Sequence, residues 1–362
     1  MSPRGVSAYS LVNATVRALY SMMLTPETWD VLVRAQDFYG VLNVLSKTVY
    51  APYLQIKRED MTPRRAVYQL EWHLADLYEK LIRLTPEPGR QLLLQLWQLY
   101  EVDNLKATLR GIETGASWDQ VRHLLWPMAK HTTLTAADME SMVQSRDMAR
   151  AIERIRHIPY YDTLVHALER YHAEKNLFPL EVALDLDYRR TLWQSVDQLK
   201  GLDHEQAMGI VGTVLDVDNL LWAIRYRVYH HLSEQEIINY TLPFGYRVRD
   251  EDIRAIAAGA DIAQVVKRIY PGVDGLGQFA GQPSTGLAAL ELSLNRHIVN
   301  TCRAALRGYP FHIGVPVAYL LLNEHEIRDL TVLIEAKASG LPLETFGSLL
   351  EIQPPSDQAD QR

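Results

Sequence analysis

Tyrosine and glutamate recur in this chain at intervals as long as a whole domain. The positions lie 110 residues apart in each case: Tyr50, Tyr160 and Tyr270 for tyrosine, and Glu71, Glu181 and Glu291 for glutamate. Solenoid repeats are only about 20–50 residues long, so they cannot give this period. The spacing predicts three copies of one domain-sized unit of about 110 residues.

A third landmark lies downstream of each repeated glutamate. It is Asn104-Leu105, Asn219-Leu220 and Asp329-Leu330, which lie 33, 38 and 38 residues after the glutamates. Taken alone, the stretch EVDNLKATLR around the first landmark has the acids and amide of a divalent-metal site. The third copy, however, carries Arg328 and Glu335 where the others carry aspartate and arginine. A ligand set would not survive these exchanges, so the landmark indicates the polar side of a long helix that packs through its leucine.

The pattern between the landmarks is helical almost throughout. In YQLEWHLADLYEKLIRL the leucines lie three and four residues apart, which is the apolar stripe of an α-helix. No run alternates apolar and polar residues between turn residues, as a half-buried strand would. The predicted fold class is all-α. Three similar domains in one chain imitate a trimer, and trimers close into rings around an axis.

Turn residues and a short closing helix delimit each copy. Breaks are expected where glycine or proline interrupts the helical pattern, at 85–89, 200–203 and 307–311. Ser117 and Ser233 are the expected N-caps of the first two closing helices, and proline ends all three, at Pro127, Pro243 and Pro354. The predicted domains are residues 1–128, 129–246 and 247–355, followed by a flexible tail at 356–362.

Composition limits the classes of function. Hydrophobic residues make up 48% and charged residues 22% of the 362 residues, which is a globular composition. The net charge of −7 disfavours nonspecific nucleic-acid binding, which depends on neutralising phosphates. The single cysteine, Cys302, is expected to be a buried thiol in a reducing compartment. The longest apolar run, residues 313–322, is half a bilayer span, so neither a signal peptide nor transmembrane insertion is expected.

The sequence lacks the motifs of known catalytic and metal sites. HExxH, GxSxG and CxxC are absent, and His325 has no second histidine four residues away. Asp185 and Asp187 lie two residues apart, so they diverge on a helix and are expected to be solvated or paired. The Gly-rich segment at 272–286 fits neither nucleotide-binding motif. No catalytic residue, cofactor or metal is therefore predicted.

Several stretches, taken in order, resemble one known family. They are YSLVNATVRAL near the N-terminus, PYYDTL and LFPLEVALDLDYRRTL in the second copy, the paired EVDNLKATLRG and DVDNLLWAIRYR, and PFHIGVPVAYLLLNEHEIRDLTVLIEAKASGLP near the end. Over roughly residues 8–350 the chain resembles the C subunit of prokaryotic V-type (A/V-type) rotary ATPases. That protein is homologous to the d subunit of the eukaryotic V-ATPase membrane sector.

The resemblance implies three pseudo-symmetric helical domains around a central funnel or socket, on the cytoplasmic face of the plasma membrane. The broad face would rest on the membrane rotor ring of proteolipid subunits, and the socket would receive the foot of the central stalk, which the D and F subunits form. The protein would pass torque between the ATPase head and the ring that moves H⁺ or Na⁺, and would catalyse nothing itself. The alternatives from the residues alone are an all-α enzyme with a central cavity and a generic helical scaffold.

The repeated glutamates are the candidate contact residues. Glu71, Glu181 and Glu291 would line the socket and meet a basic stalk foot. The alternative, which is favoured because repeated polar positions often serve repeated packing, is that each pairs with a cation such as Arg110 or Arg225. The three repeated tyrosines are expected to be packing anchors with hydrogen-bonded hydroxyls.

Overall fold

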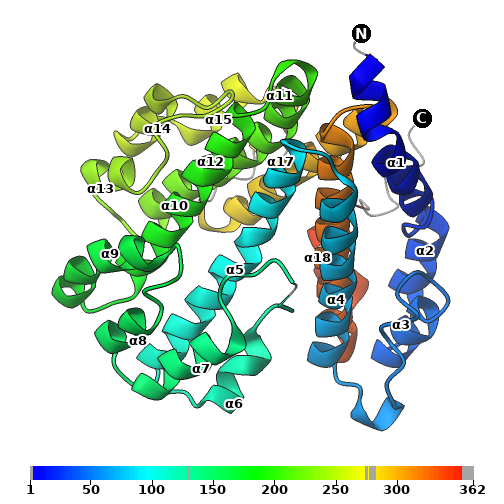
Figure 1. The fold of residues 1–362 in the computed structure, drawn as a ribbon, viewed down its shortest axis with the longest axis horizontal. Helices are drawn as coiled ribbons and strands as arrows, with labels where there is room; N and C mark the ends of the chain where they lie inside the picture. Colours follow the sequence, from blue (N-terminus) through cyan, green and yellow to red (C-terminus); the bar gives the residue numbers. More distant parts are fainter. Residues whose placement is uncertain (1–2, 129, 274–275, 277–282, 353–362) are drawn as a thin grey trace. The chain divides into compact units, whose positions relative to one another are not determined.

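The computed structural model describes residues 3–128, 130–273, 276 and 283–352, and over these residues it consists of helices and their connections, without a strand (Figure 1). The predicted all-α class is confirmed. Most of the Gly-rich segment, Pro354 and the predicted tail lie outside the described residues. The chain forms two compact units, and each is described by itself.

The smaller unit consists of Tyr78–Arg83 and Glu87–Leu199. Its long helix α5 packs against α10, and α6, α7 and α8 also contact α5. The helix α9 packs on α10 and α8. The bounds are α5 (Gly89–Glu113), α6 (Trp118–Val121), η2 (Arg122–Leu124), α7 (Ala136–Ser145), α8 (Met148–Arg154), α9 (Tyr161–Glu174) and α10 (Phe178–Asp197).

The larger unit consists of Met1–Leu77, Leu84–Pro86 and Lys200–Arg362. Its long helices α17 and α18 form an antiparallel pair; α12 packs on α17, and α1 and α3 pack on α18. The bounds are α1 (Pro3–Tyr20), α2 (Pro26–Arg34), α3 (Phe38–Leu45), η1 (Arg58–Asp60), α4 (Pro63–Leu84, which runs on into the smaller unit), α11 (Gly201–Ala207), η3 (Met208–Gly212), α12 (Thr213–Val228), α13 (Glu234–Asn239), α14 (Asp250–Ala257), α15 (Ile262–Ile269), α17 (Pro283–Arg307), α18 (Gly314–Ala338), α19 (Leu343–Phe346) and η4 (Gly347–Leu349).

The helix boundaries follow the turn and cap residues of the sequence. The breaks predicted at 85–89 and 307–311 fall between α4 and α5 and between α17 and α18. The break predicted at 200–203 lies slightly earlier, at 198–200, because α11 already begins at Gly201. Ser117 and Ser233 are N-caps, as predicted. Each side-chain oxygen accepts a hydrogen bond from the backbone N–H three residues on, and the side chain of that residue accepts the backbone N–H of the serine. The local sequence therefore places these helix ends without help from the tertiary structure.

The landmark helices α5, α12 and α18 lie at the centre of the packing. Leu105, Leu220 and Leu330, the leucines of the three landmarks, are all completely buried. Both α5 and α18 bury side chains around their whole circumference, as helices do when other helices surround them. The prediction that the landmark packs through its leucine is confirmed.

The two compact units cut across the three predicted repeats, whose boundaries stay a prediction. The reason is that each landmark helix packs on a neighbouring repeat. In the smaller unit α5 of the first repeat contacts α10 of the second. In the larger unit α12 of the second repeat contacts α17 of the third, and α18 of the third contacts α1 and α3 of the first.

One helix, Gly201–Val228, is long and apolar enough by length and composition to cross a membrane. It contains no long uninterrupted apolar run, because Asp203, Asp216 and Asp218 interrupt its sequence. Within the protein, 72% of its most apolar window is buried. Such burial is that of a core helix, and it accounts for the apolar composition without a membrane.

Candidate functional site: three buried clasps between repeats

A buried acid lies three residues before each landmark. Glu101, Asp216 and Glu326 are only 1%, 0% and 1% exposed. Sequence reasoning placed this stretch on the polar side of a helix and missed that these side chains are internal. The signal was present, because all three repeats carry an acid at this one position. A buried carboxylate is costly unless it accepts hydrogen bonds, so its partners reveal what it does.

Asp216 binds the segment that joins the second repeat to the third. Its carboxylate oxygens accept the backbone N–H groups of Tyr246 at 2.8 Å, Arg247 at 2.6 Å and Val248 at 3.1 Å, and the hydroxyl of Tyr270 at 3.0 Å. Burial raises the pKa of Asp216, and these four bonds oppose the rise. We call this group of contacts the second seam.

Glu101 makes the corresponding contacts at the first seam, between the first and second repeats. It accepts the backbone N–H groups of Thr133 at 2.8 Å and Leu134 at 3.2 Å, and also the hydroxyl of Thr133. Tyr160 lies beside the same carboxylate: burial is the main cause that raises the pKa of Tyr160, and the charge of Glu101 adds to it. The first and second seams are therefore built alike.

Glu326 completes the set at the closing seam, between the third repeat and the first. It accepts the backbone N–H of Leu24 at 3.1 Å and the hydroxyl of Tyr50 at 2.7 Å. Burial raises the pKa of Glu326 to about 7, against the effect of these two bonds. All three repeated tyrosines are buried, as predicted, and the hydroxyls of Tyr50 and Tyr270 are hydrogen-bonded.

The polar landmark residues hold the closing segment of their own repeat. Asn104 accepts the backbone N–H of Trp126 and donates to the same residue's carbonyl, and Asn219 does the same with Leu242. In the third repeat Asp329 instead accepts two N–H groups, those of Glu351 and Ile352, each at 2.8 Å. An amide suits one donor and one acceptor, whereas a carboxylate suits two donors. The exchange of Asn for Asp therefore follows from the bonding partners.

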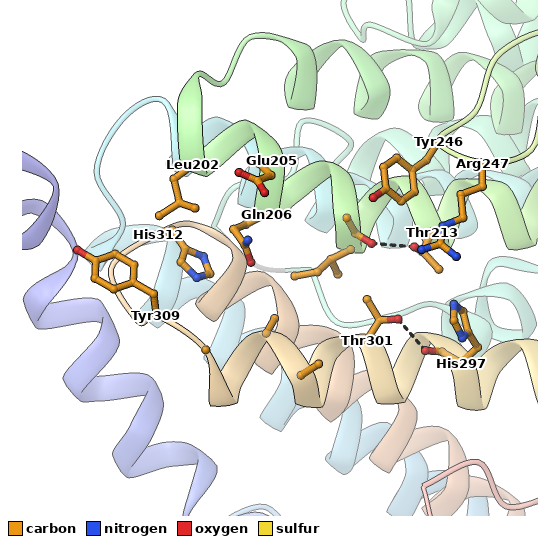
Figure 2. Close-up of a pocket in the computed structure, with 15 residues that line it drawn as sticks. Leu202, Glu205, Gln206, Thr213, Tyr246, Arg247, His297, Thr301, Tyr309 and His312 are labelled. Atoms are coloured by element: carbon orange, nitrogen blue, oxygen red, sulfur yellow. Dashed lines mark hydrogen bonds between the residues drawn. The ribbon is translucent and has the colours of Figure 1, made fainter. Parts of the chain in front are cut away.

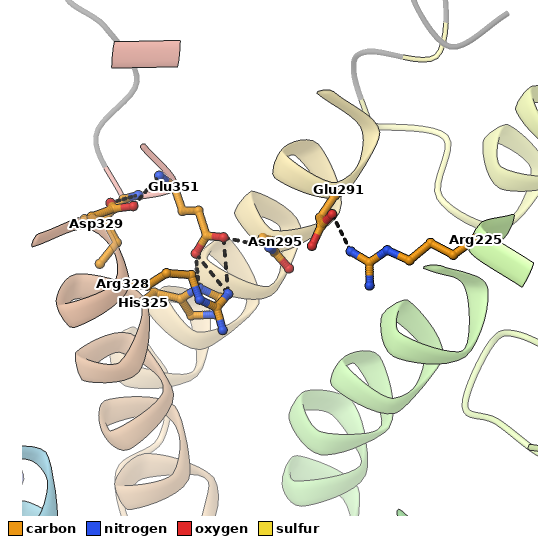
Figure 3. Close-up of polar contacts among 8 residues, drawn as sticks. Arg225, Glu291, Asn295, His325, Arg328, Asp329 and Glu351 are labelled. Carbon is orange, nitrogen blue, oxygen red and sulfur yellow. Dashed lines mark hydrogen bonds and ion pairs between the residues drawn. The ribbon is translucent and has the colours of Figure 1, made fainter. Parts of the chain in front are cut away.

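The closing segment of the third repeat has an additional polar anchor (Figure 3). Glu351 accepts from Asn295 at 2.6 Å and from Arg328 at 3.2 Å, and its carboxylate lies 2.5 Å from Nδ1 of His325. Burial alone would raise the pKa of Glu351, but His325 and Arg328 outweigh it and lower the pKa to about 2. His325 is thus accounted for by its contact with Glu351.

Two of the three repeated glutamates form ion pairs across a seam. Glu181 lies 2.6 Å from Arg110 in the smaller unit, and Glu291 lies 2.6 Å from Arg225 in the larger one, the pair drawn in Figure 3. The alternative interpretation, pairing with these arginines, is confirmed for both. Whether either glutamate also contacts a stalk stays a prediction.

Glu71 differs from its two counterparts. It makes no ion pair with any residue in the described part of the chain, and the third landmark helix offers Glu335 at the position of Arg110 and Arg225. Burial raises the pKa of Glu71 to about 7, and nearby Arg64 offsets only part of that rise. The closing seam therefore lacks the arginine–glutamate pair of the other two.

Within the described residues, no three side chains among His, Cys, Asp and Glu are grouped so that they could hold a metal ion. Asp185 is paired, as expected, with Lys106 at 2.9 Å and Arg189 at 3.5 Å. Cys302 is fully buried, and burial raises the pKa of its thiol, which leaves it protonated and unreactive. The polar residues of this molecule mainly hold repeats together.

Comparison with known proteins defines the class of the chain. Residues 12–348 match the family model described as ATP synthase (C/AC39) subunit, so the chain belongs to that family. It is accordingly a non-catalytic, accessory part of a rotary ATPase complex, peripheral to the membrane sector. This agrees with the family resemblance found in the sequence.

Individual relatives carry one name, the C subunit of the A-type ATP synthase. The relative from Methanocaldococcus jannaschii is 21% identical over 350 residues, which cover 95% of this chain and 86% of that protein. The relative from Methanobrevibacter smithii is 24% identical, with 92% and 85% covered. The protein of the same name from Archaeoglobus fulgidus is 23% identical, with 93% and 94% covered.

Proposed function

We propose that this chain couples the central stalk of a rotary ATPase to the rotor ring in the membrane. One face would receive the stalk, formed by the D and F subunits, and another would rest on the ring of proteolipid subunits. The chain would lie on the cytoplasmic side of the plasma membrane and pass torque, while the ring moves H⁺ or Na⁺. Family membership supports a place in the complex.

The closed order of the seams is the observation that carries this proposal. The first repeat binds the second, the second binds the third, and the third binds the first, each through a buried acid that lies beside the next repeat's tyrosine. When each of three similar repeats contacts both of the others in this cyclic order, an arrangement of the repeats around an axis is favoured. An axial socket is what a stalk needs, and carboxylates that clamp backbone N–H groups resist the shear that torque imposes.

The ion pairs distinguish Glu71 from the other two candidate stalk contacts. Glu181 and Glu291 each form an ion pair with an arginine of this chain, so they would interact less strongly with a basic residue of the stalk. Glu71 is the member of the set that would keep its carboxylate for a basic stalk residue. A salt-sensitive loss of stalk binding on Glu71→Gln, larger than on Glu291→Gln, is the expected consequence.

Binding measurements with purified partners test the proposed function. The chain is expected to bind a purified D–F stalk complex and a detergent-solubilised rotor ring, each on an immobilised sensor, and to hydrolyse no ATP alone. A generic scaffold would bind neither. The proposal is wrong if the chain binds neither partner while the other subunits assemble into a coupled complex without it.

A further inference from the structure

A groove runs along the larger unit between the helix Gly201–Val228 and α17 (Figure 2). Its volume is about 490 Å³. Small residues line the α17 side, namely Thr301, Ala304 and Ala305 of α17 and Gly308 just after it. Three large apolar side chains at the groove, Leu202, Tyr246 and Tyr309, are 40%, 43% and 39% exposed. A groove of mixed polar and apolar lining with exposed aromatic residues is a feature of surfaces that bind other proteins.

The helix Gly201–Val228, which forms one wall of the groove, contains a π-helical turn that the corresponding helices of the other repeats lack. The landmark helices α5 and α18 are uninterrupted over 25 residues each. The equivalent helix of the second repeat contains a π-helical turn at Met208–Gly212, and two residues of this turn, Gly209 and Ile210, line the groove. A side chain at Gly209 would meet nothing within 4 Å, so the backbone there is open to the groove. π turns of this kind occur frequently at functional sites.

At the groove, the Nδ1 atom of His312 has no hydrogen-bond partner and the guanidinium of Arg247 has no ion-pair partner among the described residues. His312 is 2% exposed, and its Nδ1 atom has no hydrogen-bond partner. Buried polar atoms of folded proteins are nearly always bonded, so this nitrogen calls for an explanation. The guanidinium of Arg247 lies 5.8 Å from the ring centres of Tyr246 and Tyr270 and forms no ion pair with a described residue.

These groups lie at opposite ends of the groove and are held in place. Figure 2 shows His312 and Tyr309 toward one end and Arg247 and His297 toward the other. Asp216 fixes the backbone of Tyr246 and Arg247 through the bonds of the second seam. Burial and the neighbouring Arg247 both lower the pKa of His297, so Arg247 supplies the positive charge at its end at neutral pH.

We propose that this groove docks an α-helix of a partner protein that presents an acidic side chain to Arg247 and a polar side chain to His312. The small residues of α17 let a helix backbone approach closely, and helix-in-groove docking is a common mode of recognition. The unpaired arginine at one end favours an acidic residue and so fixes the direction of the docked helix. This inference rests on the proposed function, because the partner is taken to belong to the same complex.

Two substitutions test the groove from different sides. Ala304→Trp fills the channel from an exposed position, and Arg247→Glu reverses the charge while leaving its backbone bond intact. Ala288→Trp, at an exposed alanine of α17 outside the groove, and Lys47→Glu, at an exposed lysine, are the matched controls. Circular dichroism and the thermal midpoint show that each variant is folded.

The binding assay uses the purified D–F stalk complex and the detergent-solubilised ring as probes. Both groove variants are expected to weaken binding of the same probe about tenfold or more, and both controls to leave it unchanged. Wild-type affinity of both groove variants for both probes would overturn the groove but leave the proposed function standing. Failure of the wild-type chain to bind either probe would overturn both.

Crosslinking identifies the occupant. Ala304→Cys carries a surface thiol that a benzophenone maleimide can label, whereas the native Cys302 is buried and serves as an unlabelled control. Light-induced crosslinks are expected on a helical partner segment that contains Asp or Glu. Crosslinks to a non-helical segment would overturn the proposal. If inorganic phosphate protected this thiol from labelling and no crosslink to a partner formed, the occupant of the groove would be a small anion and the proposed helix would be wrong.

Discussion

The first and second seams differ from the closing seam, although the same sequence positions build all three. Glu101 accepts three hydrogen bonds and Asp216 accepts four, and each of these two seams adds an arginine–glutamate pair. Glu326 accepts two hydrogen bonds, and the pair is missing because the third landmark helix carries Glu335 in place of arginine. Repetition of sequence positions therefore does not give equal bonding energy.

The comparison also concerns charge at neutral pH. Burial raises the pKa of Glu326, of Asp329 and of Glu71 to about 7 in each case. Of these, Glu326 joins the third repeat to the first through residues about 300 positions apart in sequence, whereas Asp329 holds the closing segment of its own repeat. The closing seam thus has the fewest polar bonds and the highest cost of ionisation. We expect it to be the seam whose stability depends most on pH.

The largest contrast is expected between Asp216→Asn and Glu326→Gln. In Asp216→Asn the new NH₂ group would face backbone N–H donors, so a loss of about 2–4 kcal/mol in unfolding free energy is expected. In Glu326→Gln the amide oxygen can accept from Leu24 while its NH₂ donates to the Tyr50 oxygen, so a loss below about 1 kcal/mol is expected. Urea unfolding of both variants measures the difference. Equal losses would show that the seams are energetically alike.

An effect of opposite sign is expected at Glu71 and Glu291. A folded-state carboxyl pKa of about 7, above the ordinary value of 4.5, gives stability that is present below pH 4.5 and lost as pH rises through about 7. Glu71→Gln should therefore stabilise the protein by on the order of 1 kcal/mol at pH 8 and by almost nothing at pH 5. Glu291→Gln breaks a partly exposed ion pair and should lose up to about 1 kcal/mol at pH 8.

Urea midpoints of these two variants and of the wild type, measured at pH 5 and pH 8, test this sign change. Glu181→Gln is the second control, since its carboxylate is also paired. A Glu71→Gln variant that is no more stable than the wild type at pH 8 would contradict the unpaired, desolvated state of Glu71.

The smallest effect is expected from restoring the missing pair. Glu335→Arg places an arginine at the position of Arg110 and Arg225, and it should stabilise the closing seam by about 0.5 kcal/mol at pH 8. The gain should disappear in the Glu71→Gln background, which a double-mutant cycle of urea midpoints measures. A gain that persists without Glu71 would mean that the arginine acts through another residue.

Much of this architecture could be predicted from local signals. The helix breaks, the caps Ser117 and Ser233 and the buried leucine of each landmark depend on residues close in sequence. The pairing of Glu181 and Glu291 with Arg110 and Arg225 was also foreseeable, because both partners recur at fixed positions. The internal position of Glu101 and Asp216 was missed although the acid recurs in all three repeats, since an acid on a helix usually faces water.

The sequence by itself determined the helical class, the period of about 110 residues and the family to which the chain belongs. Only the tertiary structure decided which seam each acid holds, which glutamate lacks a partner and where a groove opens. The physical reason is that periodicity and caps act over a few residues, whereas burial, pKa and hydrogen bonding depend on groups that folding brings together from positions up to 302 residues apart.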